Sequence, residues 1–123
     1  MSTSQERAVV LFGHGSRDPL WHRPIEAVAA RLAQDAPDLA VRCAYLELSQ
    51  PDLASACRDL IAGGIGRIAV LPLFLGVGRH AREDLPLLVQ QLQQEHPAVQ
   101  FTLRPAVGED PRLIGLLAQI AIG

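Results

Sequence analysis

The sequence predicts an α/β domain built on a four-stranded parallel sheet, and three observations support this. Short apolar segments alternate four times with longer segments whose apolar residues recur at helical spacing, in the order βαβαβαβα. A helix between consecutive strands requires parallel strands with right-handed crossovers. No internal repeat or linker interrupts the 123 residues, so we expect a single domain spanning residues 1–123. We expect the flavodoxin-like strand order 2-1-3-4, with helices on both faces in three layers.

The first half of the chain contains two predicted strands and the first helix. The run Ala8–Phe12 is continuously apolar, as in a strand covered on both faces. Pro19 and Pro24 both suit the opening turn of a helix, which ends before Pro37. A second strand is expected over Leu39–Leu46, where apolar residues partly alternate.

The middle of the chain contains the second helix and the third strand. Pro51 opens the helix, and Gly63 and Gly64 end it. Arg67–Leu75 forms the third strand, which we expect to weaken or bend at Pro72, because proline removes a donor from the hydrogen-bond ladder.

The last part contains two helices and the fourth strand. Apolar spacing predicts a helix from Leu85 to about Glu95 and a strand over Val99–Leu103. Asp110 and Pro111 resemble an N-cap and a first-turn proline, and they open a final amphipathic helix.

Composition excludes several classes of protein. The net charge of −2 and the absence of a basic run argue against nucleic-acid binding. The polar start MSTSQER lacks the apolar core of a signal peptide, and the longest apolar run, Ile68–Val77, is too short to span a bilayer. Cys43 and Cys57 stand singly and indicate reduced thiols rather than a disulfide. We therefore expect a soluble cytoplasmic protein that binds neither nucleic acid nor membrane.

Candidate metal ligands follow three of the predicted strands. His14 comes after the first strand, Glu47 after the second and His80 in the loop after the third. In the order 2-1-3-4 these are three adjacent strand ends, and neighbouring strands lie about 4.8 Å apart. Two imidazoles and a carboxylate suit a divalent ion such as cobalt, nickel, iron or zinc, and leave coordination positions open.

Each of these residues also has a purely structural interpretation. His14 could cap the following helix, His80 could be a solvated histidine at a helix start, and Glu47 could serve solubility alone. Their predicted convergence at one sheet edge favours the metal site. His22 and His96 lack that context, and we expect both to be surface residues.

Glycines and arginines flank the two histidines. Glycines permit turns, and they also allow a large flat ligand to approach the backbone; they are Gly13, Gly15, Gly76 and Gly78. Neither G-x-G-x-x-G nor the Walker pattern is present, which argues against a phosphate loop. Arginines could bind ligand carboxylates through forked hydrogen bonds; they are Arg17, Arg79, Arg82 and Arg104. Within the two histidine loops, Arg17, Arg79, Gly13 and Gly78 are the candidate ligand-binding residues.

Three motifs resemble those of the small CbiX-type sirohydrochlorin chelatases. They are LFGHGSRDP at residues 11–19, YLELSQP at 45–51 and GVGRHAREDLP at 76–86. The resemblance extends over nearly the whole chain, and its specificity lies in the combination and order of the motifs.

The resemblance implies ATP-independent insertion of a divalent metal into the tetrapyrrole sirohydrochlorin, in cobalamin or sirohaem biosynthesis. Cobalt is the first expectation and iron or nickel the alternatives; the metal is a substrate, and no organic cofactor is implied. His14 and His80 match the family's metal and catalytic histidines, and Glu47 matches the accompanying acidic residue. Larger members have two such lobes, so one lobe implies a homodimer around the tetrapyrrole.

Other functions remain open from the residues. A metal carrier could use the same histidines without catalysis. A phosphoryl-transfer enzyme could use His14 as its nucleophile, but it would need several arginines around that residue. A plain interaction module would leave the expected convergence of the three residues unexplained.

Overall fold

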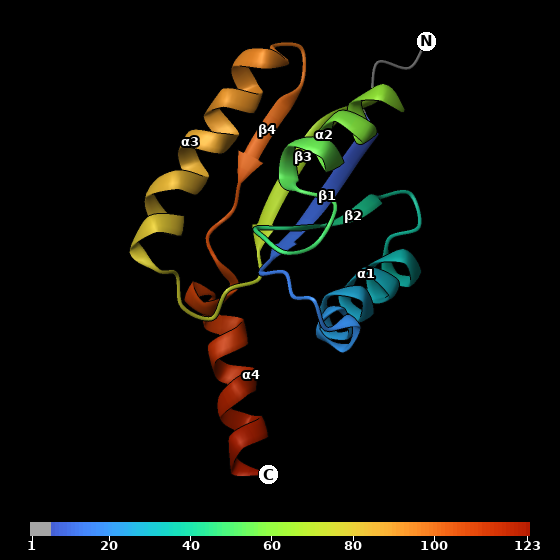
Figure 1. Ribbon diagram of the computed structural model, residues 1–123. Helices are drawn as coiled ribbons and strands as arrows, with labels where there is room; N and C mark the ends of the chain where they lie inside the picture. Colours follow the sequence, from blue (N-terminus) through green and yellow to red (C-terminus); the bar gives the residue numbers. More distant parts are fainter. Residues whose placement is uncertain (1–5) are drawn as a thin grey trace.

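A computed structural model describes residues 6–123 of the chain and contains four strands and four α-helices in alternation (Figure 1). The elements are β1 (Glu6–Gly13), α1 (Arg23–Asp35), β2 (Ala40–Tyr45), α2 (Leu53–Ala62), β3 (Ile65–Pro72), α3 (Arg79–Glu95), β4 (Gln100–Leu103) and α4 (Pro111–Ile122). Short 3₁₀ turns, Pro19–His22 and Val107–Glu109, precede α1 and α4.

The sheet is parallel throughout, with the order β2-β1-β3-β4. This confirms the predicted fold class and strand order. In the central register Leu11 of β1 lies opposite Cys43 of β2 and Leu71 of β3. Parallel strands place all their carboxyl ends at one edge, so the segments after β1, β2 and β3 meet there.

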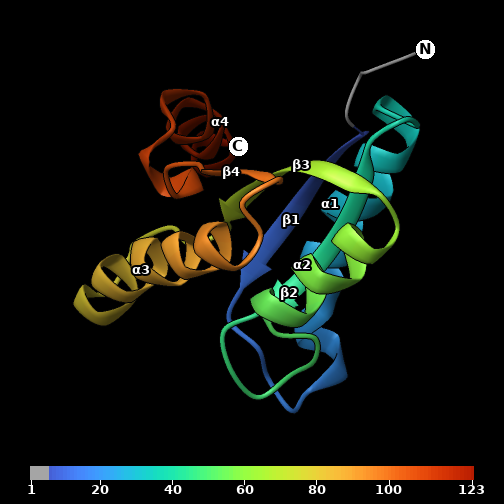
Figure 2. The ribbon, with the colours of Figure 1, turned by 90° about the horizontal axis from the view of Figure 1, so that it is seen from above.

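The two faces of the sheet are covered unequally. On one face α2 and α3 bury alternate residues of β1 and β3, and Val10, Phe12 and Val70 are at most 2% exposed. On the other face α1 packs Ile25 against Leu11 and Tyr45. Helices therefore lie on both faces, as predicted, but α1 is the one helix packed on its side of the described sheet (Figure 2).

Helix α4 forms where Asp110 and Pro111 predicted it, and the Asp110 carboxylate caps it by accepting a hydrogen bond from the Arg112 N–H at 2.8 Å. The helix nevertheless extends beyond the carboxyl edge of the sheet instead of packing on a face (Figure 1). Leu113 is half-buried, and every other residue of α4 is exposed. The amphipathic pattern predicted the helix but not where it lies.

Two other boundaries differ from prediction. Helix α3 begins at Arg79, six residues before the apolar stripe that starts at Leu85, because its first turns are exposed and carry no apolar periodicity. Strand β3 ends at Pro72, which offers no N–H of its own, and does not continue to Leu75. The Leu73 N–H still donates to the Phe12 carbonyl oxygen of β1 at 2.8 Å.

The thiols are free, as predicted: Cys57 is buried and Cys43 is half-buried. Burial raises the pKa of the Cys57 thiol to about 11, so it is a neutral core residue and not a thiolate ligand. Across residues 6–123, no helix combines the length and the apolar character that crossing a membrane requires.

Candidate functional site

The carboxyl edge of the sheet brings His14 and Glu47 into contact. Their strands are neighbours, and the His14 Nδ1 lies 3.2 Å from the Glu47 Oε1. The two side chains are 52% and 42% exposed, so a ligand can reach them. Of the three predicted site residues, these two are the pair that the structure joins directly.

The contact fixes the chemistry of the imidazole. An ionised carboxylate only accepts hydrogen bonds, so the proton of neutral His14 lies on Nδ1 and is donated to Glu47. The Nε2 lone pair then remains free to bind a metal or accept a proton. A carboxylate behind a metal-binding histidine also holds the ring in one orientation.

Close backbone packing explains why Glu47 reaches His14. A Cβ added to Gly15 would lie 1.8 Å from the Glu47 carbonyl oxygen. The Ser49 hydroxyl binds the Ser16 backbone twice: it accepts from the N–H and donates to the C=O, each at 2.9 Å. The end of β1 with the segment after it, residues 13–18, and the segment after β2, residues 46–52, therefore form an anchored loop pair.

His22 belongs to this loop pair, which corrects the expectation of a surface residue. Its Nε2 lies 2.9 Å from the Ser49 Oγ, and its ring packs on Tyr45 with 4.6 Å between centroids. Since the Ser49 proton goes to the Ser16 carbonyl, His22 is the donor. Ser49, the serine of the YLELSQP motif, was the available sequence signal for this hydrogen-bond network.

Aromatic residues hold His14 from two further directions. The Trp21 indole N–H donates to the His14 carbonyl oxygen at 2.9 Å. The Phe74 ring lies 4.7 Å from the imidazole, centroid to centroid. Sequence reasoning missed both residues because neither belongs to a recognisable chemical motif.

His80 is separate from this pair. It is an exposed residue in the first turn of α3, and its side chain makes no hydrogen bond to the residues that the structure describes. Within residues 6–123, no group of three or more His, Cys, Asp and Glu side chains is close enough to hold a metal ion. The predicted three-residue site is therefore not assembled in this conformation.

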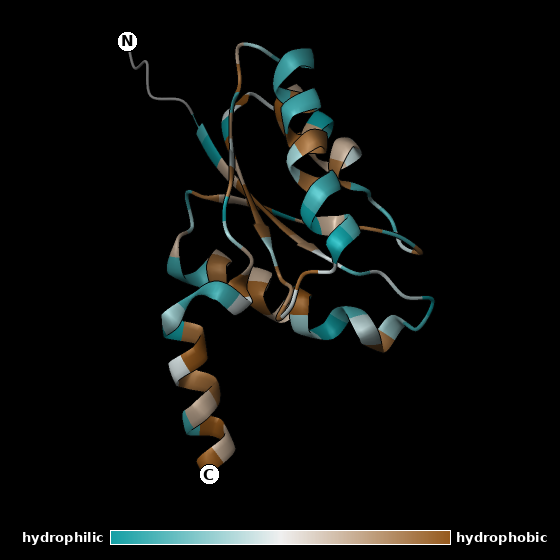
Figure 3. Ribbon diagram, turned by 90° about the vertical axis from the view of Figure 1, so that its left-hand side faces the viewer, coloured by the Kyte–Doolittle hydropathy of each residue, from teal (hydrophilic) through white to brown (hydrophobic). Residues whose placement is uncertain are grey.

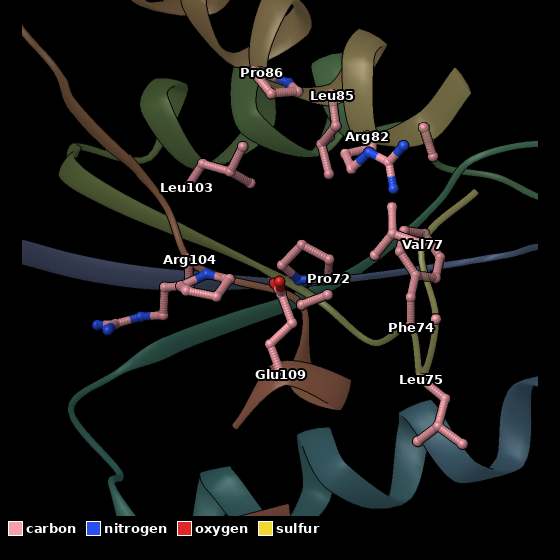
Figure 4. A pocket seen from close by; sticks show the side chains of 14 residues that line it. Pro72, Phe74, Leu75, Val77, Arg82, Leu85, Pro86, Leu103, Arg104 and Glu109 are labelled. Atoms are coloured by element: carbon pink, nitrogen blue, oxygen red, sulfur yellow. The ribbon is translucent and has the colours of Figure 1, made fainter. Parts of the chain in front are cut away.

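Two hollows flank His14. The first, of about 370 Å³, is lined by His14 together with apolar residues that include Trp21, Val28 and Leu73. The second, of about 280 Å³, lies on the other side of Phe74, between α3 and the segment after β4 (Figure 4).

Charged groups border the second hollow. Arg82 and Glu109 enter it from opposite sides, whereas the Arg104 guanidinium points away from its centre (Figure 4). The carboxyl edge thus offers apolar surface on both sides of His14, and on one side it adds a cation, Arg82, and an anion, Glu109.

The other candidate ligand-binding residues occupy different settings. Arg17 is exposed, whereas Arg79 pairs with Glu83 at 3.2 Å within α3. A Cβ at Gly13 would make an ordinary contact of 3.6 Å with Ile25, and one at Gly78 would meet nothing within 4 Å. Both glycines leave room at the backbone.

Comparisons with known proteins agree on one family. A family model described as CbiX matches residues 8–121. The sirohydrochlorin cobaltochelatase of Methanococcoides burtonii is 30% identical over 87 residues, which are 71% of this chain and 66% of that protein. The match thus spans slightly less than two thirds of this relative's length.

Solved structures show the same fold. A CbiX protein from Marinobacter aquaeolei VT8 superposes with a TM-score of 0.80 at 31% identity, covering 94% of this chain and 93% of that one. The sirohydrochlorin chelatase SirB from Bacillus subtilis subspecies spizizenii, solved in complex with cobalt, gives a TM-score of 0.77 at 22% identity. This chain covers 49% of SirB.

Proposed function

The chain is a member of the CbiX family, and from that membership we propose that it inserts a divalent metal ion into sirohydrochlorin without ATP. Cobalt is the first candidate, because a similar relative is named a sirohydrochlorin cobaltochelatase. Iron and nickel are the alternatives, since borderline nitrogen and oxygen donors accept all three ions.

The observation that carries the proposal is the His14–Glu47 pair at the open carboxyl edge. Metal insertion must remove two pyrrole protons and deliver a partly dehydrated cation. The free Nε2 of His14 can bind the metal ion or accept a pyrrole proton, although one lone pair cannot do both at once. Glu47 acts as a positioning residue, because it holds the ring and stabilises the imidazolium that forms when Nε2 accepts a proton.

His80 supplies the second imidazole in this proposal. Since it lies apart from His14 in this conformation, the segment of residues 76–80 has to bring it to the site when substrate binds. One histidine can then hold the metal while the other accepts a proton.

The surroundings suit a flat macrocycle. Trp21 and Leu73 offer apolar contact on one side of His14, and Phe74 packs against its ring. Arg17, Arg79 and Arg82 can bind acidic substituents at the rim. One lobe provides one wall, and we infer that a second copy provides the other in a homodimer.

A metalation assay tests the function directly. Sirohydrochlorin is mixed anaerobically with cobalt, iron or nickel, and the change in its absorption spectrum is followed with and without the protein. We expect at least one metal to be inserted well above the protein-free rate. Insertion at the protein-free rate with all three metals would contradict the proposal.

A metal-binding titration separates the enzyme from a carrier. Cobalt binding without acceleration of insertion would favour the carrier function. His96→Ala is the matched control for His14→Ala, because His96 follows α3, away from the carboxyl edge, and its ring makes no hydrogen bond to other described residues.

A further inference from the structure

The contact between His14 and Glu47 is one of two side-chain contacts that join the anchored loops in the same register. The other contact joins Ser16 and Ser49, which lie two residues further along each loop. Both pairs are 33 residues apart in the sequence, so the two segments run side by side without a shift. A displacement of one loop along the other at the serines would therefore separate the imidazole from the carboxylate.

The sheet does not maintain this register by itself. The ladder between β1 and β2 ends at the pair Gly13 and Tyr45, and one further hydrogen bond follows, from the Leu46 N–H to the Gly13 carbonyl oxygen at 2.8 Å. Strand β1 is hydrophobic over most of its length (Figure 3), so it brings no polar side chain to the loop that follows it. In the second loop Leu48 has a φ of 64°, a left-handed conformation that a Cβ atom disfavours. The second loop therefore depends on side-chain contacts to keep its conformation.

The Ser49 hydroxyl group provides the contact that holds the second loop. It accepts a hydrogen bond from the Ser16 N–H and donates one to the Ser16 carbonyl oxygen, each at 2.9 Å. A hydroxyl group has one proton to donate and two lone pairs with which to accept. One lone pair is left, and the His22 Nε2–H donates to it at 2.9 Å. His22 thus completes the hydrogen bonding of this hydroxyl group.

His22 is itself held in place by its surroundings. Its ring is half-buried and packs on Tyr45, with 4.6 Å between centroids and 31° between planes, and Tyr45 is a core residue. The preceding residue, Trp21, donates to the His14 carbonyl oxygen at 2.9 Å. Two consecutive residues of the 3₁₀ turn Pro19–His22 therefore hold the two loops, Trp21 the first loop and His22 the second.

We propose that His22 is a positioning residue of the metal site: it fixes Ser49, and thereby the register in which Glu47 meets His14. Its Nε2 atom already donates to Ser49, so His22 does not offer that atom to the metal ion. Contacts outside the ligand shell orient a metal-binding histidine, and their loss weakens metal binding by roughly 10- to 100-fold. This inference rests on the proposed role of His14 as a metal ligand and adds a residue that controls its geometry.

The affinity of the full chain for cobalt tests this role, measured by isothermal titration without tetrapyrrole. His22→Phe keeps a planar ring against Tyr45 but has no N–H, and we expect it to weaken cobalt binding about 10-fold. His22→Gln places an amide N–H near the position of Nε2, and it should restore the affinity to within about 3-fold of the wild type. His96→Phe is the matched control, because His96 follows α3 away from the carboxyl edge, and it should bind cobalt like the wild type.

A double-mutant cycle tests whether His22 acts through Ser49. We expect Ser49→Ala to weaken cobalt binding at least as much as His22→Phe does. The double variant His22→Phe/Ser49→Ala should bind cobalt no more weakly than Ser49→Ala alone, because the two residues form one network. Far-UV circular dichroism verifies that every variant is folded at the temperature of the titration.

Kinetics distinguish positioning of the metal ligand from a general disturbance of the edge. In the metalation assay His22→Phe should lower kcat about 10-fold, because His14 is then poorly oriented toward the metal ion. The KM for sirohydrochlorin should stay within about 2-fold of the wild-type value, since the surfaces proposed to contact the macrocycle are unchanged. His22→Gln should recover kcat as it recovers cobalt binding.

Three results would overturn the positioning role: wild-type cobalt affinity in His22→Phe, no recovery in His22→Gln, or losses from His22→Phe and Ser49→Ala that multiply in the double variant. Cobalt affinities that follow the expected pattern without metal insertion into sirohydrochlorin would contradict the proposed function and leave the positioning role standing. Metal insertion by the wild type, together with an unchanged cobalt affinity in His22→Phe, would do the reverse.

Discussion

The two histidine-bearing segments of the molecule are built in opposite ways. The anchored loop pair around His14 is connected by the Gly15–Glu47 backbone contact and by the Ser49 hydrogen bonds. In the segment 76–80, added Cβ atoms at Gly76 and Gly78 would meet nothing within 4 Å, and His80 is exposed. Val77 is the residue of this segment that packs partly against the core.

The difference indicates a division of labour. In the proposed reaction the metal ion needs one ligand whose position is set in advance, and we propose that His14, with Glu47 behind it, meets that need. Exchange of the ion into a macrocycle also needs a ligand that can approach and withdraw, which an open segment permits. The following predictions test this contrast, in order of decreasing expected effect.

Removing the anchored histidine should have the largest effect. We expect His14→Ala to lower kcat/KM for metal insertion at least 100-fold, since it removes both a positioned metal ligand and a proton acceptor. His80→Ala should lower kcat/KM by about 10-fold, because the His80 imidazole is not held in position before substrate binds. Steady-state metalation kinetics measure both losses, with His96→Ala as the control. A greater loss in His80→Ala than in His14→Ala would reverse the proposed roles.

Separating the two anchored loops should come next. In Gly15→Ala the new Cβ meets the Glu47 backbone, so the loops must move apart, at a cost of about 1–3 kcal/mol in the free energy of unfolding. Gly76→Ala is the matched change in the open segment, where there is space, and should alter stability by within about 0.5 kcal/mol. Urea denaturation measures both variants. Equal stability of the two would show that the anchored pair is not closely packed.

The carboxylate behind His14 should contribute less. We expect Glu47→Gln to weaken cobalt binding and lower kcat/KM by about 10-fold, because an amide can accept the Nδ1–H hydrogen bond but does not stabilise an imidazolium as well. Glu95→Gln alters a carboxylate at the last residue of α3, whose hydrogen-bond partner is Gln91 and which lies away from the carboxyl edge, and it should leave both values unchanged. Isothermal titration with cobalt measures the dissociation constant. An equal dissociation constant for Glu47→Gln and the wild type would contradict a role for Glu47 in metal binding.

The smallest effect concerns the cap of α2, which follows the anchored pair. Hydrogen bonds from Ser55 lower the pKa of Asp52 below its ordinary value of 3.8. The ionised cap therefore stabilises the fold fully above pH 3.8, and this contribution is lost as the pH falls through the lowered folded pKa.

We expect Asp52→Ala to cost about 1 kcal/mol near pH 7, and the difference from the wild type should shrink in acid. Asp52→Asn retains a capping oxygen and should stay near wild-type stability at neutral pH. Denaturation midpoints at several pH values measure the stability difference between Asp52→Ala and the wild type. A stability difference that grows below pH 3.8 would contradict the expected pH dependence.

Much of the site could be predicted because strand order and strand ends follow from local patterns. The sequence places His14 and Glu47 after neighbouring parallel strands, and the structure brings them together. Sequence reasoning missed Trp21, Phe74 and the Ser49–His22 contact. The Phe74 and Ser49–His22 contacts join residues from different loops, and the Trp21 contact spans seven residues within the β1–α1 connection. No local periodicity or motif encodes such pairings.

The sequence by itself determined the alternation of strands and helices, the parallel sheet and the edge at which the histidines lie, because hydrophobic periodicity and turn residues act locally. The tertiary structure alone decided three matters: that Glu47 orients His14, that His80 stays apart, and that α4 leaves the sheet. Each depends on how closely distant backbone segments approach, as at Gly15 against Glu47 and Gly108 against Leu75. An amphipathic pattern shows that α4 must bury a face, but not which surface that face covers.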